Sequence, residues 1–359
     1  MATLITKWFS MAVVTGPLAL YSERRYRALP ELPPSTLTFD LPALSIIIPA
    51  RNEADNLRRL LPTLASAFYP GSLELIVVDD NSVDETAQVA RDLGASVISL
   101  ASIPEGWSGK TYACHRGAMA STGEWLLFTD ADTVHHPRGP AHAVAYAERK
   151  GLDGLSLFIR PVTSGFADSL TLPVAFAGLF LGLGTDRSVL NGQYILLSRN
   201  VYTKSRGFAA VARETLEDLA LGHHLQQNGF HVPLLHSDVV ASVHMYAGTV
   251  DLWQGLVRLG AGSLRWFGAR ALITALFVTG AMAPILALVA ALRQRRKRRW
   301  AVASWAVVTA GFIPWASRFG AVWTALLAPV GALIVQMAAV WGLIRRVAGQ
   351  GVPWKGRRV

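Results

Sequence analysis

The stretch that decides the fold is LSIIIPARNE, residues 44–53, in which a short apolar run passes into a polar segment. An apolar run without alternation is expected of a strand buried on both faces of a parallel sheet. Two later stretches have the same design, LELIVVDD at 73–80 and EWLLFTDAD at 124–132, and both end on carboxylates. The three stretches predict buried strands that present polar side chains where they end.

Helical patterns separate these strands. The leucines of NLRRLLPTL, residues 56–64, recur at the period of a helix that Asn52 can cap. Residues 84–93 and 110–121 are also expected to be helical, and ASVISL at 95–100 to be a further strand. This alternation predicts an α/β fold with a doubly wound, mainly parallel sheet, which binds ligands at the carboxyl ends of its strands.

The composition indicates a membrane-attached protein. Hydrophobic residues make up 52% of the 359 residues and charged residues 16%, where a soluble domain carries about 25%. The net charge of +10 comes largely from basic clusters at 293–299 and 345–358, beside apolar segments. That position is typical of membrane flanks and excludes a nucleic-acid-binding stripe. The single cysteine, Cys114, excludes a disulfide framework and is predicted to be buried.

Membrane segments are predicted on both sides of the α/β domain. The expected order is an N-terminal anchor (1–27), a Pro-rich linker (28–42), the α/β domain (43–250), an amphipathic interface helix (251–270), hydrophobic segments (271–344) and a basic tail (345–359). The basic residues that end the anchor would stay in the cytoplasm.

Three apolar blocks follow the interface helix, at 271–292, 300–317 and 319–344. If all three crossed the membrane from a cytoplasmic catalytic domain, both basic clusters would lie outside, against the positive-inside tendency. We therefore expect 271–292 to be re-entrant or interfacial, with two to four spans in the whole chain. A further apolar run at 171–184 is too short to span and fits a core helix or an interfacial segment equally.

The strongest chemical feature is TDADT at 129–133, directly after an apolar strand. Asp130 and Asp132 stand two residues apart and can meet one cation together. Carboxylate oxygens suit Mg²⁺ or Mn²⁺, which also bind a substrate diphosphate. An isolated D-x-D can equally be a solvated turn, so the neighbouring strand ends decide between the two interpretations.

Further polar residues follow the other strands. Asp79 and Asp80 can accept hydrogen bonds from a base or a ribose, as acidic residues do at the strand ends of dinucleotide-binding folds. Arg51 and Glu53 follow the first strand and can also face a nucleotide. Neither a Walker P-loop nor a G-x-G-x-x-G turn follows any strand, so metal and side chains must bind the phosphates.

In this order and spacing, SIIIPARNE, VVDDNSVDET, GWSGKTYAC and TDADT resemble family 2 glycosyltransferases of the GT-A fold, over about residues 43–260. The resemblance implies a nucleotide-sugar donor, UDP by default, a divalent metal (Mg²⁺ or Mn²⁺) and transfer to an acceptor hydroxyl or phosphate. It implies donor nucleotide contacts at Pro49, Ala50, Arg51, Glu53, Asp79, Asp80, Lys110 and Asp130, and metal binding at Asp130 and Asp132.

The family also has an acidic pair before a helix, which Glu217 and Asp218 supply here. An inverting transfer needs a carboxylate within hydrogen-bond reach of the acceptor hydroxyl. We predict that Asp218 is this base and that Glu217 is its neighbour; the alternative is an exposed pair favoured by the helix dipole.

In some GT-A enzymes a later histidine completes the metal shell. His244 and His236 are the candidates here, although a lone histidine more often has a structural role.

The segment NGQYILLSRN, residues 191–200, resembles the acceptor side of the family, with an ordinary strand and turn as the equal alternative. The acceptor-side candidates are Gly192, Gln193, Tyr194 and, in the interface helix, Trp253. Processive synthases carry Q-x-x-R-W near that helix, whereas this chain has GSLRW at 262–266, which lacks the Gln. That difference argues for transfer of a single sugar.

The pattern P-x-G-W-x-G-K-x-x-A at 104–113 resembles the hopanoid-associated and carotenoid glycosyltransferases. The resemblance implies an isoprenoid lipid acceptor, which stays in the bilayer because each buried methylene contributes about 0.8 kcal/mol. The prediction is therefore a multi-pass plasma-membrane enzyme with a cytoplasmic catalytic domain. The alternatives are a polyprenyl phosphate or glycolipid acceptor and, in another class, an inactive binding or scaffold subunit.

Overall fold

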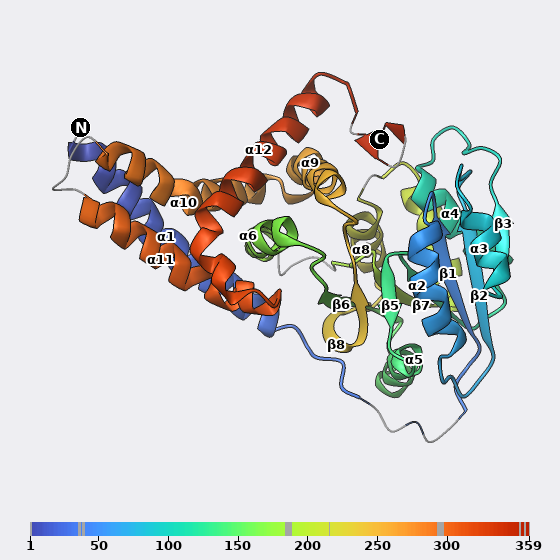
Figure 1. Ribbon diagram of the computed structural model, residues 1–359. Coiled ribbons are helices and arrows are strands. Elements are labelled where there is room, and N and C mark those ends of the chain that lie inside the picture. The colour runs from blue at the N-terminus through green and yellow to red at the C-terminus, as the bar shows by residue number, and fades with distance from the viewer. Residues whose placement is uncertain are drawn as a thin grey trace. The chain divides into compact units, whose positions relative to one another are not determined.

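The computed structural model describes residues 2–34, 37, 40–183, 189–214, 216–292, 298–351, 353–354 and 357–358. The chain forms two compact units. The α/β unit consists of Leu29–Val162 and Thr185–Met245, and the helical unit of Met1–Ala28, Thr163–Gly184 and Tyr246–Val359. Each unit is described by itself (Figure 1).

A mixed sheet forms the centre of the α/β unit. Its described residues give eight strands in the order β3-β2-β1-β4-β7-β6-β8-β5. Four of the seven strand pairings are parallel, and the three antiparallel ones all involve β7 or β5, so the predicted mainly parallel sheet is confirmed. The strands are β1 Leu44–Ala50, β2 Leu73–Asp79, β3 Ser96–Ser99, β4 Trp125–Thr129, β5 Thr133–His135, β6 Gly154–Pro161, β7 Tyr194–Ser198 and β8 Leu234–Val243.

β1 is apolar throughout because it is covered from both faces. It lies between β2 and β4, and Ile46, Ile47 and Ile48 are all fully buried. On one face Ile46 and Ile48 share a core with the buried leucines of α2. On the other face α4 approaches so closely that a Cβ at Gly117 would lie 2.4 Å from Cγ2 of Ile47. Close helix packing on both faces explains the absence of alternation in this strand.

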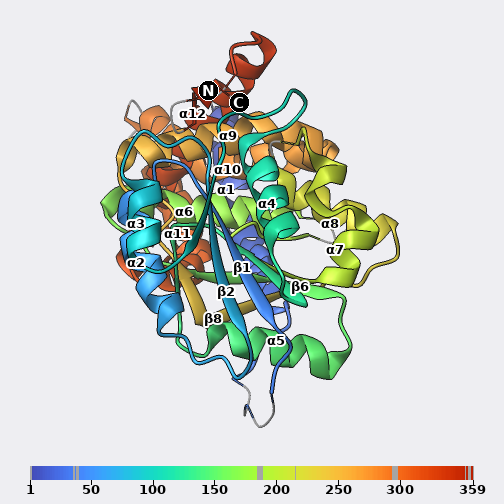
Figure 2. The same ribbon diagram turned by 90° about the vertical axis from the view of Figure 1, so that its right-hand side faces the viewer.

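Helices α2 and α3 lie on one side of β1 and β2, and α4 lies on the other (Figure 2). The helices of this unit are α2 Ala54–Ala65, α3 Thr86–Asp92, α4 Gly109–Ala120, α5 Gly139–Lys150, α7 Arg199–Ser205, η1 Gly207–Val211 and α8 Glu217–Gln227. The prediction that Asn52 caps α2 is wrong, because Glu53 holds the N-cap position. Asn52 instead has a φ of 53° and accepts a hydrogen bond from the Val83 amide, 2.9 Å away.

The helical unit contains α1 Ala2–Arg27, α6 Phe166–Gly182, α9 Thr249–Phe267, α10 Ala269–Ala291, α11 Arg298–Arg318, η3 Val322–Leu327 and α12 Ala328–Val347, with the short strands β9 Pro353–Trp354 and β10 Arg357–Arg358 after them. Among the described residues, three helices are long and apolar enough to cross a membrane: α10, α11 and Val322–Val347. α1 is not one of the three, and its anchoring role stays a prediction.

Of the two alternatives predicted for 271–292, re-entrant or interfacial, the structure contradicts only the first, and the second stays a prediction. A re-entrant segment reverses direction, whereas α10 continues as one helix through Gly280 and Pro284. Several predicted segments fall partly outside the described residues: 35, 36, 38 and 39 of the linker, 293–297 of the first basic cluster, and 352, 355, 356 and 359 of the tail. On which side of a membrane the linker, the basic cluster and the tail lie is not tested by the structure.

Small residues bring the long helices close together, and α1 runs beside both α10 and α11 (Figure 1). A Cβ at Gly311 would lie 2.5 Å from the Gly16 carbonyl oxygen, and one at Gly280 would lie 2.1 Å from Oγ1 of Thr15. Close contact through glycine is typical of helices that associate inside membranes, where no hydrophobic driving force acts between them.

Candidate active site

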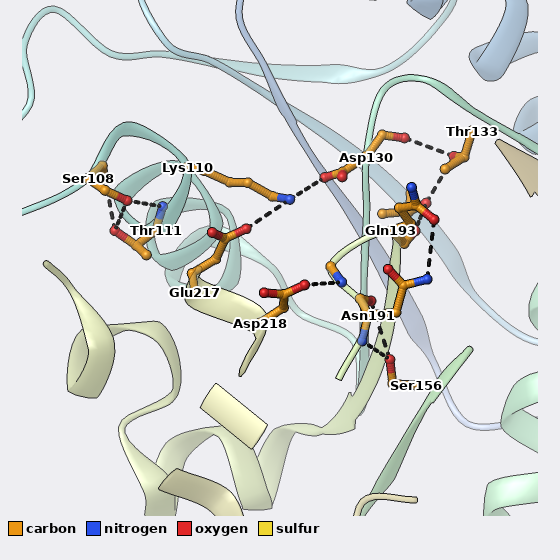
Figure 3. A network of polar contacts seen from close by, with 12 residues as sticks. Ser108, Lys110, Thr111, Asp130, Thr133, Ser156, Asn191, Gln193, Glu217 and Asp218 are labelled. Carbon is orange, nitrogen blue, oxygen red and sulfur yellow. Dashed lines mark hydrogen bonds and ion pairs between the residues drawn. The ribbon is translucent and has the colours of Figure 1, made fainter. Parts of the chain in front are cut away.

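Three segments far apart in the sequence bring charged side chains together in the α/β unit (Figure 3). Lys110 lies in the first turn of α4, Asp130 follows β4, and Glu217 begins α8. Nζ of Lys110 lies 2.7 Å from Oδ1 of Asp130 and 3.0 Å from Oε1 of Glu217. The three residues line one pocket together with Pro49 and Gly192, among others. The carboxyl ends of β1 and β4 therefore meet at a charged site, as expected for such a sheet.

The ion pairs decide the protonation of Lys110. Burial disfavours its positive charge, but Asp130 and Glu217 outweigh burial and raise the pKa of Lys110 well above its ordinary value. Cys114, one turn further along α4, is buried as predicted, and burial raises the pKa of its thiol, although Lys110 opposes this. The pocket thus holds a charged ammonium beside a neutral thiol.

Asp218 lies beside the same pocket. Its Oδ2 accepts a hydrogen bond from the Gly192 amide at 3.0 Å, and its Oδ1 accepts one from the Leu219 amide at 2.9 Å. Burial and the neighbouring Glu217 raise the pKa of Asp218 to about 6, although Lys110 opposes them. A carboxylate with this pKa is ionised at neutral pH and still basic enough to accept a proton from a hydroxyl group.

Gly192 permits the close approach of two charged groups. A Cβ at this position would lie 3.1 Å from Nζ of Lys110 and 3.3 Å from Oδ2 of Asp218. Any side chain here would push the ammonium or the carboxylate away. The backbone of Gly192 therefore lines the pocket between them, on the side predicted for the acceptor.

A buried polar network holds the turn that carries the D-x-D carboxylates. Oγ1 of Thr133 donates to the Asp130 carbonyl oxygen at 2.8 Å, and Oγ1 of Thr129 donates to the Gln193 carbonyl oxygen at 2.9 Å. Nε2 of His135 lies 3.1 Å from Oγ1 of Thr129. Burial lowers the pKa of His135 to about 3, so the ring is neutral. Sequence reasoning missed this network, and its only signal was the polar alternation in TDADTVH, residues 129–135.

Of the two candidate histidine ligands, only His244 is bonded to the D-x-D turn through its backbone. The His244 amide donates to the carbonyl oxygen of Asp132 at 2.9 Å, so His244 flanks the D-x-D turn. His236 lies near the start of β8, where its backbone exchanges hydrogen bonds with Pro30 and Leu32. Burial, and secondarily Arg59, lower the pKa of His244, which favours the neutral form that binds metals.

The donor set fits a divalent cation that shares its ligands with a substrate. Within the described ranges, no group of three or more His, Cys, Asp or Glu side chains could hold a metal ion. Asp130 and Asp132 supply carboxylate oxygens from a single turn. Mg²⁺ is commonly bound by one or two carboxylates plus substrate phosphates, which matches this arrangement.

The predicted nucleotide-binding residues come together where β1 and β2 end. Nη1 of Arg51 donates to the Asp80 carbonyl oxygen at 2.6 Å, and the Glu53 amide donates to Oγ1 of Thr86 at 2.8 Å. Oδ1 of Asp79 accepts from the Ser82 amide at 3.2 Å. These bonds tie the two loops into one surface. Pro49 and Ala50 end β1 beside it, and Pro49 also lines the pocket.

One predicted acceptor-side residue, Tyr194, has its side chain buried away from the pocket. Tyr194 is fully buried in β7 and stacks on His135, with ring centroids 5.5 Å apart, so its side chain does not face an acceptor. Trp253 belongs to α9 of the helical unit, and its acceptor-side role stays a prediction. Gln193 stays beside the pocket, where its Oε1 accepts from Nδ2 of Asn191 at 3.2 Å.

The burial of Tyr194 predicts that the substitution Tyr194→Phe changes the stability of the protein only slightly. Its hydroxyl has no hydrogen-bond partner among the described residues, so Tyr194→Phe removes a desolvated polar group. We expect the free energy of unfolding to stay the same or to rise by about 1 kcal/mol. Tyr69→Phe is the matched control, because the Tyr69 hydroxyl donates to the Pro42 carbonyl oxygen and its loss should destabilise the protein by about 1 kcal/mol. Thermal unfolding of both variants in detergent measures the difference, and a larger loss for Tyr194→Phe contradicts the expectation.

Comparison with known proteins agrees with this geometry. Residues 45–175 match the family described as Glycosyl transferase family 2. The chain is 28% identical over 311 residues to the 4,4'-diaponeurosporenoate glycosyltransferase of Staphylococcus aureus strain USA300, covering 82% of this chain and 80% of that protein. The fold is similar to that of a mannosyltransferase from Pyrobaculum calidifontis solved with GDP-Man and Mn²⁺, with a TM-score of 0.60 at 17% identity over 94% of this chain and 98% of that one. The predicted GT-A fold and the resemblance to carotenoid glycosyltransferases are thereby confirmed.

Proposed function

We propose that this chain, of which residues 45–175 match Glycosyl transferase family 2, is a membrane-bound inverting enzyme that moves one sugar from a nucleotide-sugar to a lipid acceptor. The observation that carries the proposal is the cluster of Lys110, Asp130, Glu217 and Asp218 around one pocket. Its charges suit a donor diphosphate, a cation and a general base. UDP is the default nucleotide.

The donor side is formed by the ends of β1, β2 and β4. Arg51, Asp79 and Asp80 would contact the nucleoside, and Lys110 the diphosphate. Asp130 and Asp132 would hold Mg²⁺ or Mn²⁺, with His244 beside them. The cation, when bound, neutralises charge that develops on the leaving diphosphate.

Asp218 supplies the base in this proposal. Its ionised carboxylate accepts the proton of the acceptor hydroxyl or carboxyl group while the oxygen of that group attacks the anomeric carbon from the face opposite the diphosphate, and the nucleoside diphosphate leaves. Two backbone amides hold the carboxylate in place, at 3.0 and 2.9 Å. Glu217 pairs with Lys110 and keeps the pKa of Asp218 high, and is therefore a positioning residue.

The acceptor in this proposal is an isoprenoid lipid with a hydroxyl or carboxyl group, such as a carotenoid or hopanoid. The relative from Staphylococcus aureus is named for 4,4'-diaponeurosporenoate. Three helices of membrane-spanning length would keep the enzyme in the bilayer with such a lipid. We place the protein in the plasma membrane, with several spans and the α/β unit in the cytoplasm.

Labelled nucleotide-sugars added to membranes that contain the protein test the proposal. We expect label in a neutral, organic-extractable glycolipid, and none with membranes that contain Asp218→Asn. Label in a charged, acid-labile lipid would identify a polyprenyl phosphate acceptor instead. If all label stays in the aqueous phase with every donor and either metal, the proposed function is wrong.

The raised pKa of Asp218 predicts the pH dependence of the reaction. The base works only when ionised, and its pKa is raised from 3.8 to about 6, so kcat/KM should fall about tenfold per pH unit below about pH 6. An unperturbed aspartate would keep full activity down to about pH 4. In Glu217→Gln the midpoint should move to lower pH, because the negative charge of Glu217 helps to raise this pKa. A profile that is flat to about pH 4 contradicts the assignment.

A further inference from the structure

Lys110 is bound to the same carboxylate that the proposed cation would use. Nζ lies 2.7 Å from Oδ1 of Asp130, within direct ion-pair distance. We infer that Lys110 and the divalent cation compete for Asp130, and that the donor diphosphate ends the competition by drawing Lys110 to itself. The inference rests on the proposed function and adds an order of events: cation and nucleotide bind together, and the cation alone binds weakly.

The position of the ammonium makes the competition direct. Lys110 is held from two sides, by Asp130 and by Glu217 at 3.0 Å, and a Cβ built on Gly192 lies within 3.3 Å of both Nζ of Lys110 and Oδ2 of Asp218 (Figure 3). The ammonium therefore lies among three carboxylates. A divalent cation at Asp130 would stand next to a lysine that is already there, and two cations on one carboxylate repel each other.

The same geometry offers Lys110 another partner. It is the second residue of α4, whose first turn favours a negative group because of the helix dipole and its backbone amides. A diphosphate at this end of the helix gives the ammonium a new anionic partner, and Asp130 is then released for the cation. Glu217 remains as the second anchor of the lysine. The exchange leaves each positive group with a negative partner.

The charge count supports the exchange. Asp130, Glu217 and Asp218 carry three negative charges when ionised, and Lys110 carries one positive charge. The excess of two negative charges attracts a divalent cation, while the lysine occupies one oxygen of Asp130 and places a positive charge beside the carboxylate. Cation affinity in the free protein should therefore be low because of Lys110 and not because of missing carboxylates.

Mn²⁺ titration of the full-length protein in detergent, followed by electron paramagnetic resonance, tests the inference. For the wild type we expect weak binding of Mn²⁺ alone and about tenfold tighter binding when UDP or GDP is present, within the usual range for coupled sites. Lys110→Met should bind Mn²⁺ alone about tenfold more tightly than the wild type, and added nucleotide should tighten binding less. Arg116→Met is the matched control, since it removes one positive charge from an exposed position on the same helix and should change nothing.

The outcomes separate the inference from the proposed function. If Lys110→Met binds Mn²⁺ no more tightly than the wild type, or binds none at all, the inference is wrong, whatever the transfer assay shows. Lys110→Gln repeats the test if the Met variant does not fold. An equal gain in Arg116→Met would show a general charge effect and would also overturn it. The proposed function fails separately, if no sugar reaches a lipid in the wild type.

Discussion

Asp218→Asn is expected to lower the transfer rate at saturating donor by on the order of 10²- to 10⁴-fold, the usual contribution of a general base. Donor affinity should stay within about twofold of the wild type, because the hydrogen bonds of the Asp218 carboxylate go to the Gly192 and Leu219 amides and, among the described residues, not to the predicted nucleoside loops. The amide of Asn has the size of the carboxylate, and its oxygen can still accept from the Gly192 amide. Asn has a single oxygen and cannot also accept from the Leu219 amide, so the variant removes the base together with one of the two hydrogen bonds that hold the group.

Single-turnover transfer and equilibrium donor binding measure the two effects separately. Asp238→Asn is the matched control, since Asp238 is exposed in the same unit and the chemical change is identical. A rate loss in Asp238→Asn as large as that in Asp218→Asn would mean that the loss reflects folding. Normal turnover by Asp218→Asn would remove the assigned base and with it the inverting mechanism as proposed.

The sheet was predictable because its central strands are buried on both faces. The apolar run at 44–50 coincides with β1, and the run at 73–80 with β2 to within one residue. A re-entrant segment was predicted in place of the continuous helix α10 because Gly and Pro commonly interrupt helices, which Gly280 and Pro284 do not do here. Neighbouring helices tolerate such residues inside membranes, and α10 here packs closely against α1 at Gly280.

The site was predictable only in part, for reasons of geometry. Residues 193 and 194 are adjacent, and successive side chains of a strand point to opposite faces, so only one of them can face the pocket. Tyr194 takes the buried face. His135 was missed because the polar alternation at 129–135 does not show whether a histidine is buried. The pairing of Lys110 with Asp130 and Glu217 joins residues 20 and 107 positions apart, which no local pattern reports.

Asp132→Ala is expected to raise the Mn²⁺ or Mg²⁺ concentration needed for half-maximal donor binding by on the order of 100-fold, since even indirect partners of a metal contribute 10- to 100-fold. Asp132 is the informative carboxylate of the D-x-D pair. Asp130 also binds Lys110, so its removal would release the ammonium and change donor affinity for a second reason. Asp132→Ala changes the cation site alone and leaves the lysine cluster in place.

Donor binding titrated against metal concentration measures this effect, with Asp238→Ala as the control for loss of an exposed carboxylate in the same unit. Asp218→Asn and Asp132→Ala should differ in their response to metal.

The Asp218→Asn variant should bind donor normally at ordinary metal concentrations and fail to transfer the sugar. The Asp132→Ala variant should recover both donor binding and much of its turnover as the metal concentration rises, because its base is intact. If excess metal restores neither, the defect of Asp132→Ala is not a loss of cation affinity. If donor binding is independent of metal, the D-x-D turn is not a cation site, and Lys110 must meet the charge on the leaving diphosphate.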